Sequence, residues 1–161
     1  MSEKFNQTIV NLPNNLTHLI FGNSFNQALT NLPHCLTHLS FGFHFNQKIK
    51  TLPNIVFLKL NCNNQYIIDY LPNSVEELRL DSEFNLELNN LPTSLRKITF
   101  TRYCNYNKEL NCLPNFVEFL QLPEKYNKKI LRIPEKLNQI VCSKDYEFLN
   151  DFANLNVQHY Y

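Results

Sequence analysis

The segment Phe25–Phe45 reads F-N-Q-A-L-T-N-L-P-H-C-L-T-H-L-S-F-G-F-H-F, and the same words begin again at Phe45-Asn46-Gln47. They also stand twenty residues earlier, from Phe5 onward. Leu-Pro or Ile-Pro pairs recur along the chain, with prolines at positions 13, 33, 53, 72, 92, 114 and 134, so that neighbouring pairs are 19 to 22 residues apart. A sustained period of this length predicts a solenoid of stacked repeats, about seven in number.

Each repeat contains the pattern of one short, half-buried strand. Apolar residues stand three, six and eight positions after the proline, as Leu36, Leu39 and Phe41 do after Pro33. The last two alternate at period two, which is typical of a strand with one buried face. The rest of the unit is short, and its proline disfavours a regular helix. We therefore predict a parallel sheet with strands about 4.8 Å apart and little or no regular helix.

A second pattern, an aromatic residue followed by Asn, precedes most of the proline pairs. Phe25-Asn26 is one example, and the fourth unit breaks the rule with Asn64-Gln65-Tyr66. There we expect Tyr66 or Ile67 to fill the space of the missing ring. The Asn amides are expected to satisfy buried turn carbonyls. Gly22 and Gly42 are expected to supply turn conformations that side chains resist.

The repeat pattern fades near the C-terminus. We interpret residues 1–161 as a single repeat domain, with repeats over 5–143 and a divergent last coil or C-terminal cap over 144–161. A cap is expected because an open solenoid end exposes apolar side chains and strand edges. The N-terminal end shows no recognisable cap, so we expect a monomer or weak end-to-end self-association.

The composition indicates in which cellular compartment the protein resides and which classes of partner it does not bind. A formal net charge of +1 gives no field that would attract nucleic acid or a membrane surface. No secretory signal and no apolar run of roughly 20 residues is present in the sequence. The five cysteines are odd in number and form no C-x-x-C pair, which favours reduced thiols and an intracellular, cytoplasmic location.

The words Leu-Pro-x-x-Leu-x-x-Leu-x-Phe-Gly-x-x-Phe-Asn-Gln, at 12–27 and again at 32–47, resemble the FNIP repeat. That family is related to leucine-rich repeats and is known mainly from social amoebae and giant DNA viruses. The resemblance implies a right-handed, curved, β-rich solenoid with its parallel sheet on the concave face, used for protein–protein contact. If the chain is viral, the resemblance implies that the protein is located in the host cytoplasm. Several members join the repeats to an F-box, which suggests substrate recruitment for ubiquitin ligases.

Candidate partner-binding residues are those that the strand pattern points out of the sheet. They vary between coils while the inward positions stay apolar, which is what a binding face on a fixed scaffold looks like. The selected residues are His18, His38, Phe57, Lys59, Glu77, Arg79, Asp81, Lys97 and Phe119. An aromatic residue beside an arginine is typical of a contact hot spot. The alternative is a solvated face with cross-strand ion pairs such as Glu77–Lys97.

Enzymatic and metal chemistry find little support in the sequence. His18 and His38 would lie one rung apart, but two histidines without a third ligand make a poor zinc site, and a surface pair titrating near pH 6 is favoured instead. The cysteines occupy repeat slots and read as structural thiols. No phosphate-binding, metalloprotease or hydrolase motif is present. We therefore expect no enzyme and no cofactor, but a protein-interaction module. The alternatives are a ubiquitin-ligase adaptor and a structural, self-assembling repeat protein.

Overall fold

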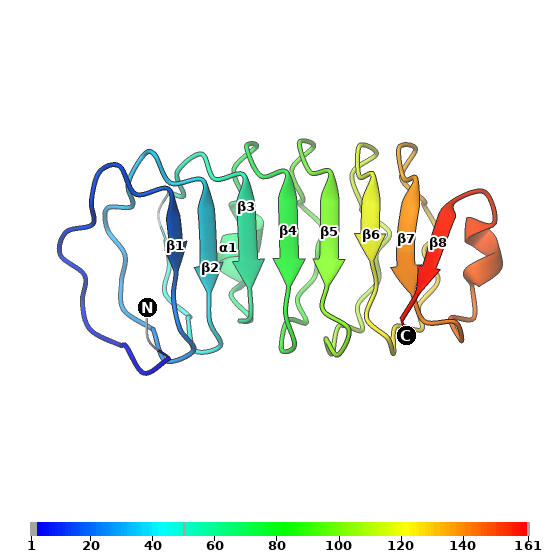
Figure 1. The fold of residues 1–161 in the computed structure, drawn as a ribbon, viewed down its shortest axis with the longest axis horizontal. Helices are drawn as coiled ribbons and strands as arrows, with labels where there is room; N and C mark the ends of the chain where they lie inside the picture. Colours follow the sequence, from blue (N-terminus) through cyan, green and yellow to red (C-terminus); the bar gives the residue numbers. More distant parts are fainter. Residues whose placement is uncertain (1–2, 50, 161) are drawn as a thin grey trace.

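The computed structural model describes residues 3–49 and 51–160 and forms one eight-stranded parallel sheet with its strands in chain order (Figure 1). The strands are β1 (His18–Ile20), β2 (His38–Phe41), β3 (Phe57–Leu60), β4 (Glu77–Leu80), β5 (Lys97–Phe100), β6 (Phe119–Gln121), β7 (Gln139–Cys142) and β8 (Asn156–His159). Each coil supplies one strand and then returns behind the sheet. The predicted parallel-sheet solenoid is confirmed.

A ladder of aliphatic side chains holds the strands in register. Leu39 of β2 pairs with Leu19 and Leu58, and Leu78 of β4 pairs with Leu58 and Ile98. All of these side chains are buried. Fully burying a side chain of this size stabilises the fold by roughly 1.5–3 kcal/mol, and no coil could bury its own without neighbours. The strand register therefore follows from the Leu-rich inward positions.

Aromatic rings form a second ladder inside the coils. Phe25 stacks on Phe5 and Phe45 with ring centroids 6.0 Å apart. In the later coils the rings are tyrosines, whose hydroxyls donate to backbone carbonyls: Tyr126 to Lys108 at 3.2 Å and Tyr146 to Lys128 at 2.7 Å. These bonds keep the polar atom of a buried ring satisfied.

The fourth coil, which lacks the aromatic-Asn pair, contains a short helix, α1 (Gln65–Asp69). Asn64 caps it by accepting from the Ile67 N–H at 3.4 Å, and it donates to the Gln47 carbonyl at 3.0 Å. Ile67 is buried, as is Ile68, while Tyr66 is half-buried. Little regular helix is present, as predicted, but this coil is an exception, because Asn64 supplies a helix cap that is also tied to the preceding coil.

The asparagine ladder exists, and Asn63 Nδ2 donates to the turn carbonyl of Glu83 at 2.8 Å as predicted, but the bonds that link one ladder position to the next run the other way. The Asn26 N–H donates to Asn6 Oδ1 at 2.8 Å, and the Asn46 N–H donates to Asn26 Oδ1 at 2.9 Å. Asn85 N–H and Asn107 N–H continue the pattern with bonds to the side chains of Asn63 and Asn85. The amide oxygen thus satisfies the backbone N–H of the next coil, rather than a turn carbonyl.

The prediction that the glycines supply a turn conformation was also wrong, since neither glycine has a positive φ. Gly42 is instead required by crowding between coils. A Cβ built there would lie 2.4 Å from the Gly22 carbonyl oxygen and 2.6 Å from the Asn23 Cα. Two backbones pass so closely at this point that a side chain has no room.

The divergent C-terminal segment continues the sheet. It forms the 3₁₀ helix η1 (Leu149–Phe152) and then β8, which pairs in parallel with β7. Phe152 packs into the core, with its ring centroid 6.0 Å from that of Tyr146. Within the described residues, no helix has the length and apolar character needed to cross a membrane.

Candidate interaction face

Two rows of outward side chains run across the sheet, and we call them row A and row B. The strand register aligns row A as His18, His38, Phe57, Glu77, Lys97, Phe119, Gln139 and Asn156. It aligns row B as Ile20, Ser40, Lys59, Arg79, Thr99, Gln121, Val141 and Gln158. Asp81 follows β4 and lies just beyond row B. All nine residues selected from the sequence therefore lie on one face, which we call the strand face.

Row A begins with a continuous stack of rings on β1 to β3. The His18 and His38 rings are 4.0 Å apart and within 13° of parallel, and His38 stacks on Phe57 at 5.5 Å. Each histidine Nδ1 lies 2.9 Å from the hydroxyl of the preceding threonine. This part of row A is a preordered aromatic surface, and burying such a surface costs little side-chain entropy.

The hydrogen bonds fix the tautomer of the neutral His38 ring. The Thr37 hydroxyl donates its proton to the Thr17 carbonyl at 3.2 Å, so it must accept from His38 Nδ1–H. Nε2 is then the unprotonated nitrogen of the neutral ring. Burial and the neighbouring His18 lower the pKa of His38, and Glu77 only partly opposes them. His38 is therefore neutral at physiological pH.

A hollow of about 290 Å³ opens in the strand face beside these rings. Its accessible lining is almost entirely apolar and comes from β1, β2 and β3, including Ile20, His38, Phe57 and the stem of Lys59. Ser40 is the smallest side chain of row B and lies low between its neighbours, with 8% of its surface exposed. Ile20, by contrast, is 63% exposed. The hollow can therefore accept one apolar side chain.

Charged residues follow the hollow along the sheet. Lys59 pairs with Asp81 at 2.7 Å, and Lys97 pairs with Glu77 at 3.0 Å. Burial acts to raise the pKa of Asp81, but the hydrogen bond and charge of Lys59 outweigh it, and Arg79 adds to them, so the pKa is lowered overall. Arg79 is exposed and makes no ion pair or hydrogen bond with any residue in the described ranges.

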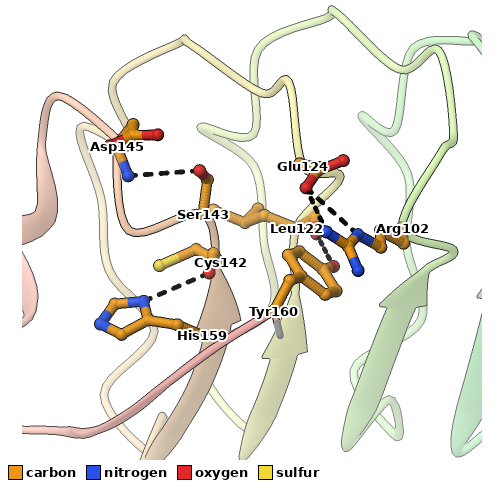
Figure 2. A network of polar contacts seen from close by, with 8 residues as sticks. All are labelled: Arg102, Leu122, Glu124, Cys142, Ser143, Asp145, His159 and Tyr160. Carbon is orange, nitrogen blue, oxygen red and sulfur yellow. Dashed lines mark hydrogen bonds and ion pairs between the residues drawn. The ribbon is translucent and has the colours of Figure 1, made fainter.

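The other end of the face carries a polar cluster that sequence patterns did not indicate (Figure 2). Arg102 pairs with Glu124 at 2.6 Å and lies 5.3 Å from the centre of the Tyr160 ring. The Tyr160 hydroxyl donates to the Leu122 carbonyl, and burial raises its pKa to about 12. Because Tyr160 lies beyond β8 and Leu122 follows β6, the cluster fastens the C-terminal segment across two coils.

The three buried cysteine thiols are poorly suited to nucleophilic chemistry. Burial raises the pKa of Cys62 to about 12, and those of Cys104 and Cys142 to about 11. All five cysteines are free, with Cys112 exposed and Cys35 half-buried. Among the described residues, no group of three or more His, Cys, Asp or Glu side chains could hold a metal ion.

The model of the FNIP repeat matches residues 5–44, 25–63 and 63–103, which together cover more than half of the chain. The chain belongs to the FNIP repeat family. The words that define this family occupy structural positions: the Phe ring joins the aromatic ladder, the Asn joins the amide ladder, and the Leu residues form the core. Rows A and B are the positions that this FNIP-repeat scaffold leaves free.

A solved structure supports the architecture of this FNIP-repeat chain. CroV588, a giant-virus protein described as "a novel circular LRR protein structure", matches with a TM-score of 0.72 and 37% sequence identity. The match covers 89% of this chain and 23% of CroV588, so the chain spans about a quarter of that protein's length. The leucine-rich-repeat-like fold is thereby shown. A comparison with curated proteins found no match.

The structure groups the selected residues of this FNIP-repeat protein into neighbourhoods. His18, His38 and Phe57 form the ring stack, while Lys97 pairs with Glu77 and also lies over the Phe119 ring at 5.4 Å. Sequence reasoning did not select Ile20 and Ser40, which wall and floor the hollow. The sequence signal that could have indicated the hollow is a small residue, Ser40, between the two larger residues Ile20 and Lys59 of row B.

Proposed function

We propose that this FNIP-repeat chain is a protein-interaction module that binds a protein partner through the strand face. One observation carries the proposal: an apolar hollow beside a ring stack lies on the same face as an exposed arginine. The strands that hold these residues are fixed by the buried ladders. Aromatic and arginine side chains are enriched in contact hot spots. The free thiols fit a reducing, intracellular compartment.

Rigidity of the scaffold supports this role. Inward residues such as Leu58, Leu78 and Ile98 are fully buried, so the backbone beneath the outward residues is held by the core. The two cross-strand ion pairs are partly exposed and each stabilise the fold by about 0–1 kcal/mol at most. The outward residues therefore contribute little to folding and are available for recognition.

The test is affinity capture from native cell extract with two matched double variants. The face variant is Phe57→Ala with Arg79→Glu. The control is Leu131→Ala with Arg132→Glu, which makes the same kinds of change in the exposed return segment between β6 and β7. We expect the face variant to lose the proteins that the unchanged chain retains, and the control to keep them. Equal retention by both variants would contradict the proposal.

A further inference from the structure

Ser40, the floor of the hollow, and Arg79 both belong to row B. Together they suggest which side chains a partner places against the strand face. We propose that the strand face binds a peptide segment in the extended polyproline II conformation, carrying an apolar side chain and, three residues from it, an acidic side chain. This inference rests on the proposed function and adds the chemistry of the partner. The apolar side chain occupies the hollow above Ser40, and the acidic side chain pairs with Arg79.

The shape of the hollow favours a single inserted side chain. Ser40 forms the floor, while Ile20 on one side and the Lys59 stem on the other are its neighbours in row B. These neighbours belong to adjacent rungs about 4.8 Å apart. An α-helix about 10 Å across would rest on both walls before a side chain reached the floor. An extended chain can lie close to the face and lower one side chain between them.

The charges around Arg79 favour a carboxylate. Lys59 is neutralised by Asp81 and Lys97 by Glu77, so that both carboxylates in this neighbourhood already have a cation. The five charged groups sum to +1, and the uncompensated charge is that of Arg79. A guanidinium can bind a carboxylate with two parallel hydrogen bonds, which adds geometric selectivity to the charge. A basic side chain at the same place would meet repulsion instead.

The register sets the spacing between the two contacts. Ser40 pairs with Lys59, and Lys59 pairs with Arg79, so the hollow and the arginine lie two rungs apart. Two rungs span roughly 9.6 Å. A polyproline II segment rises about 3.1 Å per residue with three residues per turn, so side chains three residues apart point to the same side and are about 9.3 Å apart. A helix rises only about 1.5 Å per residue and would need six or seven.

The test begins with selection from a displayed library of random twelve-residue peptides on the immobilised full chain. We expect enrichment of an apolar residue followed or preceded at three positions by Asp or Glu. Selection on Arg79→Glu in parallel should enrich Lys or Arg at that position instead. Enrichment without an acidic position, acidic spacing of six or seven, or no enrichment at all would each overturn the inference.

Binding of a selected synthetic peptide is then measured by fluorescence polarisation. Arg79→Glu should weaken binding at least tenfold, and Ser40→Leu, which fills the hollow, should do the same. Ile20→Ala removes one wall without adding bulk and serves as a second test of the hollow. Lys136→Leu adds an apolar side chain to the exposed return segment between β6 and β7, away from the strand face, and should leave binding unchanged. Circular dichroism melts show whether each variant is folded.

The outcomes separate the two proposals. If selected peptides lose binding to Phe57→Ala but show no acidic preference, the strand face binds partners and only the stated chemistry is wrong. If they bind Phe57→Ala and Arg79→Glu as well as the unchanged chain, they bind elsewhere. Both the inference and the proposed function then fail.

Discussion

Gly42→Ala should destabilise the protein although its backbone conformation suits alanine. At a compatible φ, replacing Gly by Ala stabilises a protein by about 0.4–1 kcal/mol, because the unfolded chain loses freedom. Gly42 has no positive φ, so this gain is available. The new Cβ, however, would lie 2.4 Å from the Gly22 carbonyl oxygen and 2.6 Å from the Asn23 Cα. Both atoms are backbone, so they cannot move aside by a rotamer change.

The size of the destabilisation follows from how far the two neighbouring coils must move apart. The two coils would have to move apart by about 1 Å to restore an ordinary contact, and overpacking of this kind costs about 1–3 kcal/mol. The junction is also held by Phe21 N–H to the Ser40 carbonyl at 2.9 Å and His44 N–H to the Asn23 carbonyl at 3.0 Å. Weakening such bonds costs about 0.5–1.5 kcal/mol each. We expect a net loss of about 2–4 kcal/mol.

Urea unfolding followed by far-ultraviolet circular dichroism measures this loss, and hydrogen exchange locates it at the Phe21 and His44 amides. The matched control is Asn61→Ala. Asn61 is the equivalent position one coil later, where a Cβ is already accommodated, and the change removes only the 3.5 Å hydrogen bond from Asn61 Nδ2 to Asn23 Oδ1, so we expect a loss of no more than about 0.5–1.5 kcal/mol. A Gly42→Ala variant as stable as the unchanged protein, or more stable, would refute the crowding argument and leave only the unfolded-state effect.

Three further predictions concern the core, the ring stack and the C-terminal cluster. Leu78→Ala should cost about 2–5 kcal/mol of unfolding free energy by leaving a core cavity, and a urea midpoint shift measures it. The lowered pKa of His38 means that the unfolded chain binds the proton first as pH falls below about 6.5, so stability should decrease toward acid. His38→Gln should flatten that slope between pH 7.5 and 5, and an unaltered slope would exclude this residue as its source. Tyr160→Phe removes the bond to the Leu122 carbonyl and should speed amide exchange in β8, whereas unchanged exchange there would show that the hydroxyl does not hold the segment.

The sequence predicted the sheet because its signal is local and repeated. Leu39, Leu58 and Leu78 recur at nearly the same distance after each proline, and that spacing alone sets strand, register and buried face. The role of Gly42 was missed because its cause is a contact between coils, which no local turn rule describes. Helix α1 was missed for a related reason, since Asn64 is a helix cap whose amide is held by the preceding coil.

The strand face was predictable in position and only partly in detail. Period two places Phe57 and Lys59 outward, and the constant repeat length aligns each with its neighbours. The Lys97–Glu77 pair follows from that alignment. The contact of Arg102 with Tyr160 does not, because Tyr160 lies beyond the last recognisable repeat, and its contact depends on the path of the chain after β8.

The inward ladders carry the fold and the outward rows A and B do not. This difference explains why the fold continues where the family's sequence pattern has ended. The FNIP match ends at residue 103, yet the sheet continues to β8. Later coils replace Phe by Tyr126 or Tyr146, and the fold accepts the change because each hydroxyl finds a carbonyl of the preceding coil. Apart from the buried Ser40, rows A and B are under no such constraint, since their side chains are at least partly exposed to solvent. Substitutions there can alter the partner at little cost to stability, while a polar atom introduced into a ladder must find a hydrogen bond between coils or destabilise both neighbours.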